Sequence, residues 1–536
     1  MMKTKIYRFQ IMLMAWMIGM ACLSCDRFFI PDKSLVLDEE DHYSEIGEVK
    51  TAFLGIMATF RDAAEHNVLI SELMGDLTYP TDEAPQEVWE VFRYSATNGN
   101  DWVDPAPFYK IVLNCNDFLQ HLVVFQRENP TIFAANEYKG MISVAVGYRT
   151  WAYLTLGKIY GEAVYYDALL DNPEQGATGR LLSLDELIRV LIDDMNNGVD
   201  GVNGFQTLPW TTFFSSAATW LYWQMLTVNP HALTSELYLW NRDYELAAQK
   251  ALDAVILANG YTSNKVYYKM EETFAASSWK KLFTGSYETV FAESFTVAPF
   301  EKSTTFEQVN HLQYYFSGDY PNVYYIRPND LLVSKYQSQG DIHRGEDVTF
   351  RVGTKGREIC KYSVERKSND HDAFIHIYRA ADVFLLLAEA LAHNEELAAA
   401  DSLLNYGVKP SWDYSNFAQP FSAPKYTAGS YCLANCRGVR GRVNLERKML
   451  SDHVGEDATQ SRRVAVLDSL IAEEAGMECA YEGKRWFTLL RMARNLGDPD
   501  FLAKQACLKF AEGEREHYRE LLADSRNWFI RYDHTR

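Results

Sequence analysis

The sequence lacks the motifs that mark the common catalytic and metal-binding classes. Its 536 residues contain no GxSxG, HExxH, P-loop or Rossmann glycine pattern, which removes the usual grounds for assigning a hydrolase, a metalloprotease or a nucleotide-binding enzyme. Ser277 and Lys280 match the SxxK pattern of penicillin-binding enzymes, but the companion SDN and KTG patterns are absent. His371 and His376 stand five residues apart with no third histidine beside them, which does not match the spacing of a zinc motif. We therefore predict no catalytic residue, no metal site and no cofactor.

Cysteine and positive charge are also scarce. The sequence has eight cysteines, and Cys432 and Cys436 have neither the CxxC spacing nor a second Cys/His pair, so a local disulfide and two independent thiols both remain open. Lysine and arginine number 52 against 72 aspartates and glutamates, which gives a net charge of −20. This balance argues against nucleic acid and anionic lipid surfaces as partners.

The one candidate membrane segment stands at the N-terminus and is too short to cross a bilayer comfortably. Three basic residues precede an apolar run over 11–23, and a small residue, Ser24, precedes Cys25. This order is typical of a signal peptide over 1–24. Cys25 is then the expected lipidated first residue of the mature chain, with Cys22 as the alternative cleavage site. Acyl chains on Cys25 would hold the protein to a membrane.

Aromatic residues, in contrast, are abundant, with 33 tyrosines in the chain, more than a generic core requires. Many lie in two segments without sustained periodicity, 71–107 and 311–327, and long irregular loops in compact domains are usually functional. Flat aromatic rings suit sugar rings, and Asp and Asn side chains can bond hydroxyls, although helical repeats also use Tyr and Trp for packing. The predicted ligand-contacting residues are Asp76, Trp89, Asn98, Trp102, Tyr320 and Tyr324.

Helical periodicity accounts for most of the remaining chain. We predict helices over 44–66, 108–125, 136–160 and 183–197, hairpins that pair 212–226 with 241–258 and 379–392 with 395–404, and short strands over 288–297 and 374–378. Ser183 and Glu186 form a capping box at the start of the fourth helix. The spacing of Tyr153, Leu156, Gly157 and Tyr160 is typical of a tetratricopeptide first helix, in which Gly157 lets a partner helix approach.

The segment 470–494 organises the C-terminal part. It contains no proline and has apolar residues at helical spacing, so it predicts one continuous helix with a buried face. Glu474, Glu478 and Glu482 follow one another at intervals of four residues and would repel each other on an isolated helix. Arg485 and arginines from other helices should pair with them. We interpret the three carboxylates as a structural ion-pair ladder; the alternative is a catalytic or metal pair.

Several separated motifs resemble the SusD/RagB family, the surface lipoproteins of Bacteroidetes nutrient-uptake systems. The C-terminal motif matches at Glu478, Tyr481, Glu482, Gly483, Arg485, Trp486 and Leu489. Further matches occur at Trp102, Tyr109, Val112 and Asn116, at Arg149, Tyr153, Leu156, Tyr160 and Gly161, and at Arg379, Ala381, Asp382, Leu385, Ala388, Glu389 and Ala390. The sequence departs from the family pattern at Ala475 and Thr488. The residues after Cys25 also resemble the start of mature family members.

The resemblance implies a mainly α-helical fold with four tetratricopeptide-like hairpins packed against a loop-rich part with a few short strands. It implies an N-terminal SusD-like region over 25–270 and a C-terminal RagB/SusD region over 271–536. The expected role is a non-enzymatic outer-membrane lipoprotein, exposed at the cell surface, that captures an oligo- or polysaccharide and delivers it to a SusC-type TonB-dependent transporter. A peptide-capturing member of the family and, as a further alternative, an α-helical glycoside hydrolase remain open, because sequence spacing does not exclude two carboxylates across a cleft.

Overall fold

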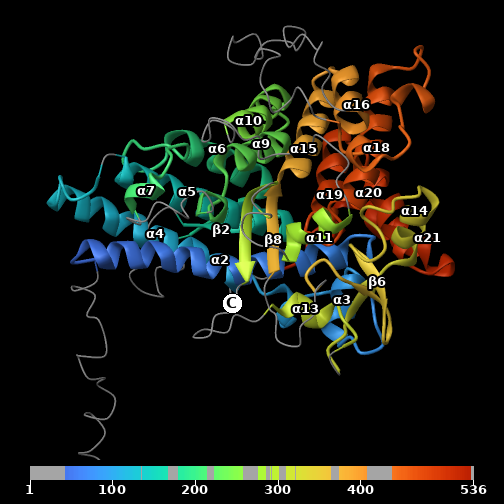
Figure 1. Ribbon diagram of the computed structural model, residues 1–536, viewed down its shortest axis with the longest axis horizontal. Coiled ribbons are helices and arrows are strands. Elements are labelled where there is room, and N and C mark those ends of the chain that lie inside the picture. Colours follow the sequence, from blue (N-terminus) through green and yellow to red (C-terminus); the bar gives the residue numbers. More distant parts are fainter. Residues whose placement is uncertain are drawn as a thin grey trace, which may run out of the picture.

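The computed structural model describes residues 43–134, 136–166, 179–213, 223–257, 276–284, 290, 293–300, 310–319, 322–363, 373–406 and 437–532. A long helix, α2 (Ile46–Met74), runs along one side of the molecule (Figure 1). It was predicted to end at residue 66, but it continues to Met74 because its second half is almost entirely buried. The side chain of Lys509 donates to the carbonyls of Leu73 (2.7 Å) and Met74 (3.2 Å), so a lysine from the C-terminal part caps this helix.

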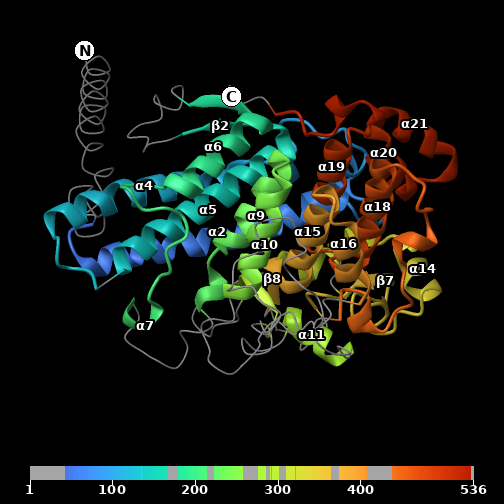
Figure 2. The ribbon, with the colours of Figure 1, turned by 90° about the horizontal axis from the view of Figure 1, so that it is seen from above.

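The other long helices follow one another around the molecule. They are α4 (Ala106–Glu128), α5 (Glu137–Tyr160), α6 (Leu184–Asn197), α9 (Pro230–Asn241), α10 (Tyr244–Leu257), α15 (Ala380–His393), α16 (Leu397–Asn405), α18 (Gln460–Glu478), α19 (Arg485–Leu496), α20 (Pro499–Ala506) and α21 (Glu512–Ala523). Helices α4, α5 and α19 pack against α2. Consecutive helices pack as pairs, namely α4 with α5, α9 with α10, α15 with α16 and α20 with α21 (Figure 2). Helix α10 also packs on α15, which joins the N-terminal and C-terminal parts. The predicted mainly helical, hairpin-based fold is confirmed.

The tetratricopeptide-like signal in α5 corresponds to a close helix contact. A Cβ atom added at Gly157 would lie 2.8 Å from Leu184 and 3.0 Å from Leu187, both on α6. The absence of a side chain therefore permits α5 and α6 to pack, as predicted. The capping box at the start of α6 is confirmed too, because the backbone N–H of Ser183 donates to Glu186 at 3.0 Å.

Two predicted helical features are wrong. The helix that pairs with α10 is α9 and not the segment 212–226, of which residues 214–222 lie outside the described part of the chain. The segment 470–494 is two helices, α18 and α19, separated by a turn over 479–484 in which Tyr481 (φ 66°) and Gly483 (φ 75°) are left-handed. The predicted hairpin over 379–404 is confirmed as α15 and α16.

The remaining helices and the strands are short. The helices are α3 (Gln86–Phe92), α7 (Trp210–Phe213), α11 (Ala276–Thr284), α13 (His311–Tyr315) and α14 (Asp330–Ser338), and the strands are β1 (Thr78–Pro80), β2 (Glu162–Tyr165), β3 (Arg180–Ser183), β4 (Ser294–Phe300), β5 (Ile326–Pro328), β6 (Phe350–Gly353), β7 (Gly356–Ile359) and β8 (Ala373–Arg379). The strands form antiparallel pairs, β1 with β5, β2 with β3, β4 with β8 and β6 with β7. The two predicted strands are thus partners, β4 and β8.

Candidate functional site

The carboxylate ladder of the C-terminal motif is a buried ion-pair network, as predicted. Glu478 is 1% exposed and accepts hydrogen bonds from Arg344 (2.7 Å), Arg379 (2.7 Å) and Arg442. Burial alone raises the pKa of Glu478, but the guanidinium groups of Arg442, Arg379 and Arg344 outweigh it and hold the pKa well below the usual range. The carboxylate is therefore charged, and its role is to hold together four segments of the chain.

The two neighbouring carboxylates of the ladder are bound in the same way. Glu474 accepts from Arg344 and Arg440, each at 2.6 Å. Glu482 accepts from Arg379 (2.7 Å) and from Lys361 (2.6 Å). The arginines come from a strand end, a 3₁₀ segment and turns, and not from other helices as predicted. Because each of the three carboxylates is held by buried cations, the alternative of a catalytic or metal pair has no support in this arrangement.

The predicted role of Arg485 in this ladder is wrong. Its guanidinium pairs with Asp76, which follows α2, through two hydrogen bonds of 2.5 and 2.9 Å. Asp76 is only 4% exposed. Asp76 was predicted to contact ligand, but in this structure it is an ion-pair residue that ties α19 to the end of α2.

The turn between α18 and α19 exists because α2 supplies its hydrogen-bond acceptor. The carboxylate of Glu72 accepts from the backbone N–H groups of Tyr481 (3.2 Å), Gly483 (3.0 Å) and Lys484 (3.3 Å). These groups include the unpaired donors at the start of α19, which has no capping side chain of its own. A residue 409 positions away in the sequence thus replaces a local N-cap.

The two aromatic segments predicted to bind ligand are brought together by a short antiparallel pairing. Strand β1 lies in the first segment and β5 in the second, with Tyr79 opposite Arg327. The pairing extends beyond the strands, since the backbone N–H of Thr81 donates to the carbonyl of Tyr325 at 2.8 Å. Helix α3, from the first segment, and helix α13, from the second, both pack on α2 (Figure 1). The sequence predicted two separate surfaces. In the structure the two segments lie together and form one surface.

Three partly exposed aromatic rings meet on this surface, and we call them the aromatic platform: Trp102, Tyr315 and Tyr325. Tyr315 and Tyr325 are stacked, with ring centroids 5.2 Å apart and an interplanar angle of 18°. The ring of Trp102 lies 5.0 Å from Tyr315 and 6.1 Å from Tyr325. Partly exposed aromatic side chains of this kind can contact a flat, weakly polar ligand such as a sugar ring.

A histidine and a buried carboxylate stand beside the platform. The ring of His311 is nearly parallel to that of Tyr315, at 6.1 Å and 19°. Glu65, on α2, accepts from the backbone N–H of His311 (2.7 Å) and contacts its Nδ1 (2.9 Å). The hydrogen bond to Glu65 raises the pKa of His311, together with the charges of Glu65 and Asp62 and against the effect of partial burial.

The structure separates the predicted ligand contacts into different groups. Trp102 belongs to the platform. Trp89 is partly exposed but lies in another aromatic cluster, with Tyr79 at 5.7 Å and Arg93 over its face. Asn98 is also partly exposed. Tyr324 is 3% exposed, and its hydroxyl donates to the carbonyl of Arg357, so the ring is part of the core in this structure.

The predicted residues Tyr320 and Cys25 lie outside the described residues, as do Cys432 and Cys436. The sequence prediction did not single out Tyr315 and Tyr325, although both occur in the tyrosine-rich segment on which it rested. Tyr324 and Tyr325 immediately precede β5, and the sequence does not show which of the two packs against the core. His311 and Glu65 gave no signal in the sequence.

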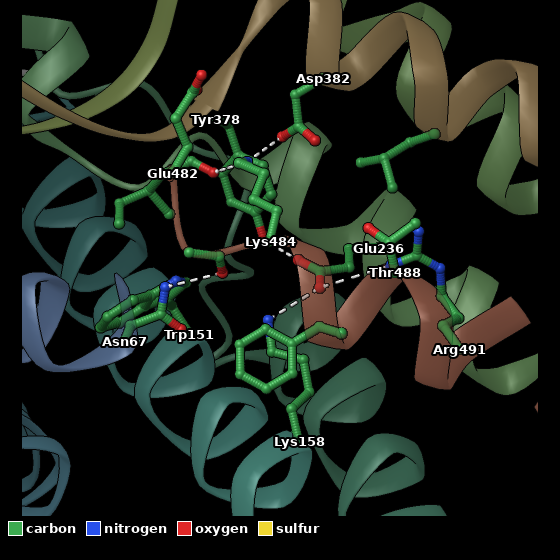
Figure 3. Close-up of a pocket in the computed structure, with 14 residues that line it drawn as sticks. Asn67, Trp151, Lys158, Glu236, Tyr378, Asp382, Glu482, Lys484, Thr488 and Arg491 are labelled. Atoms are coloured by element: carbon green, nitrogen blue, oxygen red, sulfur yellow. Dashed lines mark hydrogen bonds and ion pairs between the residues drawn. The ribbon is translucent and has the colours of Figure 1, made fainter. Parts of the chain in front are cut away.

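A polar pocket also lies in the interior, between α5, α9, α15 and α19 (Figure 3). Lys158 pairs with Glu236 at 2.9 Å, and Lys484 pairs with Asp382. On α19, Arg491 pairs with Glu389 of α15 at 2.7 Å, beyond the pocket wall. The cavity measures about 40 Å³, which suits about three water molecules and is too small for a sugar ring. We therefore interpret it as a junction of paired charges between helices.

A larger cavity, of about 360 Å³, lies beside α5, α9 and β4. Its lining mixes apolar and polar side chains, among them Phe205, Trp210, Gln224 and His231. Its size is within the range of small-molecule sites. We regard it as a second candidate pocket and prefer the aromatic platform, because both predicted segments converge there.

Metal sites, membrane spans and cysteines can be assessed for the described residues only. No group of three or more His, Cys, Asp or Glu side chains in them is arranged to hold a metal ion. None of their helices combines the length and apolar character that a membrane span requires. The described cysteines, Cys115, Cys360, Cys479 and Cys507, are free thiols and are buried.

Comparison with known sequences finds one family match. Residues 329–528, a little over a third of the chain, match the sequence model of the SusD family. The C-terminal part of the chain is therefore similar to that family. The matched region contains α15, α18 and α19, and therefore the ion-pair network, whereas Trp102 and α13 lie outside it. A comparison with curated proteins gave no match.

Solved structures of SusD relatives resemble nearly the whole chain. A SusD homologue from Bacteroides thetaiotaomicron superposes with a TM-score of 0.59 at 15% identity, covering 89% of this chain and 91% of its own. A protein described as a putative sugar binding protein, from Bacteroides vulgatus, gives 0.56 at 16% identity, with coverage of 83% and 86%. A laminarin binding SusD-like protein gives 0.55 at 13% identity, with coverage of 88% and 95%. At these identities the likeness establishes the SusD-like fold.

Proposed function

We propose that this protein is a SusD-family binding protein that captures an oligo- or polysaccharide on the aromatic platform. The observation that carries the proposal is the convergence of Trp102, Tyr315 and Tyr325 from two segments more than 200 residues apart in the sequence. A core needs buried rings, but these three keep part of their surface exposed. The names of two structural relatives, a laminarin binding protein and a putative sugar binding protein, agree with a glycan ligand.

The proposal assigns binding and not catalysis to the platform. A glycosidase needs two carboxyl groups facing each other across the scissile bond. The carboxylate beside the platform, Glu65, is 6% exposed and already holds His311. The acidic residues of the C-terminal motif are buried in the ion-pair network. None of these is available to act on a bound sugar.

The test compares matched variants of the soluble protein that begins at Asp26. Trp102→Ala and Tyr325→Ala should each weaken glycan binding at least tenfold, which corresponds to about 1.4 kcal/mol. Tyr138→Ala is the control, because it also removes a partly exposed tyrosine but lies beside the far end of α4. Helix α4 has 23 residues and so separates the two places by about 34 Å.

Calorimetry with laminarin, maltoheptaose, xylan, mannan and a tryptic casein digest would identify the ligand class, and product analysis of the same samples would detect turnover. Binding of glycan that is lost in the platform variants and kept in the control supports the proposal. Normal binding by both platform variants contradicts it. Saturable binding of the peptide digest alone would favour the peptide-capturing alternative.

We further propose that acyl chains on Cys25 anchor the protein to the outer membrane at the cell surface, and that it delivers its ligand to a SusC-type TonB-dependent transporter. The match to the SusD family and the lipoprotein-like N-terminus support this role. Cys25→Ala should release the protein from the membrane fraction, whereas Cys22→Ala should leave it there. The reverse result would move the cleavage site to Cys22. A transporter that copurifies with the membrane form but carries no SusC-type sequence would refute the delivery step.

A further inference from the structure

The position of His311 is fixed by a single buried side chain. One oxygen of Glu65 accepts the backbone N–H of His311 (2.7 Å), and the other contacts Nδ1 (2.9 Å). Glu65 is 6% exposed and belongs to α2, the long helix on which the fold is built. The clamp therefore ties the first residue of α13 to α2 and holds the imidazole ring in one orientation.

The same contact determines the chemistry of the other ring nitrogen. An ionised carboxylate can only accept hydrogen bonds, so Nδ1 must carry the proton. In the neutral ring Nε2 is then an acceptor, and in the protonated ring it is a donor. The His311 side chain is 53% exposed, and only its Nδ1 is directed at the buried carboxylate of Glu65.

The clamped ring is aligned with the platform. Its plane is within 19° of that of Tyr315, which in turn is within 18° of that of Tyr325. The three rings follow one another with centroids 6.1 and 5.2 Å apart. A ligand stacked on the tyrosines would thus meet the edge or face of an imidazole held in one orientation.

We propose that His311 orients the captured ligand, with its Nε2 hydrogen-bonded to a hydroxyl group at the end of the aromatic platform and its ring held by Glu65. This inference rests on the proposed function, because it places a polar contact beside the aromatic ones. Aromatic stacking tolerates sliding and rotation, whereas a hydrogen bond to a fixed nitrogen specifies one register. The expected ligand class is a neutral glycan, since a hydroxyl can both donate and accept.

The identity of the ligand group determines the pH dependence of binding. The charged groups that face His311 are Glu65 and Asp62, both on α2, and its ring neighbour on α13 is Tyr315. These carboxylates favour the protonated ring, so protonation extends to higher pH than for a free histidine. A ligand hydroxyl can hydrogen-bond to Nε2 in either protonation state of the ring, because it can both donate and accept. The affinity for such a ligand should then change less than about threefold between pH 5 and 8. A ligand carboxylate, which only accepts, would bind about tenfold more weakly as the ring loses its proton.

The experiment separates a hydrogen-bonding role from ring packing. Calorimetry with laminarin, maltoheptaose, xylan and mannan compares wild type with His311→Ala, His311→Phe and His311→Gln. We expect Ala and Phe each to weaken binding about tenfold, because both remove the nitrogen, although Phe keeps a stacked ring. Gln carries an amide nitrogen near the position of Nε2 and should remain within about threefold of wild type. Glu65→Gln should weaken binding and increase its pH dependence, because the ring loses its fixed tautomer.

The outcomes for His311 and for the platform are distinguishable. If Trp102→Ala loses binding while His311→Ala stays within twofold, the inference is overturned and the proposed function stands. If His311→Phe binds like wild type, the ring acts by packing and the orienting role is refuted. If no glycan binds, or if Trp102→Ala binds normally, the proposed function fails, and the inference fails with it.

Discussion

Replacing Glu478 by glutamine tests whether the buried ion-pair network stabilises the fold. The substitution keeps the shape of the side chain and removes one negative charge. Three guanidinium groups, from Arg344, Arg379 and Arg442, then lose their charged partner. Water cannot replace it, because Glu478 is only 1% exposed. Breaking a buried ion pair by removing one member costs about 3–5 kcal/mol. We expect the free energy of unfolding to fall by that amount.

Glu473→Gln is the matched control, because Glu473 is on the same helix and pairs with a single lysine, Lys448, at 2.7 Å. Both side chains of that pair are 28% exposed, so the loss should not exceed about 1 kcal/mol. Urea unfolding followed by circular dichroism measures both variants, provided that the slope with urea is unchanged. Equal losses in the two variants would refute the view that burial makes Glu478 different.

Two further predictions concern the turn between α18 and α19 and the stability of the fold at low pH. Gly483→Ala should lower the free energy of unfolding, measured with urea, by at least about 1 kcal/mol more than Gly497→Ala does. Both glycines have left-handed backbone, but an added Cβ atom would lie 2.5 Å from Asn67 at Gly483 and would meet nothing at Gly497. Similar losses would contradict this reasoning. Burial raises the pKa of Glu482 and of Glu236, but their cationic partners outweigh it and lower each to about 2 from 4.5. The two charged carboxylates therefore stabilise the fold fully above pH 4.5, and this contribution is lost as the pH falls toward 2. The urea concentration at half-unfolding should decline over this pH range. A value that does not change with pH would contradict the prediction.

Local sequence patterns predicted the helices well and failed where a distant residue decides the backbone. The segment 479–484 has no proline and reads as helix, yet the chain turns there. Its backbone donors are satisfied by Glu72, and its left-handed Gly483 lets α2 approach. Nothing within the segment itself shows that an acceptor arrives from α2. The start of α6, in contrast, was predicted correctly because Ser183 and Glu186 are three residues apart.

Composition drew attention to two aromatic segments but not to how their individual residues are placed. Strands β1 and β5 bring these two segments together. Composition could not show that Asp76 is paired with Arg485, because the partners lie 409 residues apart in the sequence. Nor could it distinguish Tyr324, which is buried, from Tyr325, which is partly exposed, because that depends on which of the two residues before β5 packs against the core.

The most direct test of the account is binding of a glycan to the soluble protein that begins at Asp26, with product analysis on the same samples. We predict saturable binding of a neutral glycan, no cleavage, and at least a tenfold loss of affinity in Trp102→Ala but not in Tyr138→Ala. Release of glycan fragments, or equal affinity in these two variants, would contradict capture on the aromatic platform.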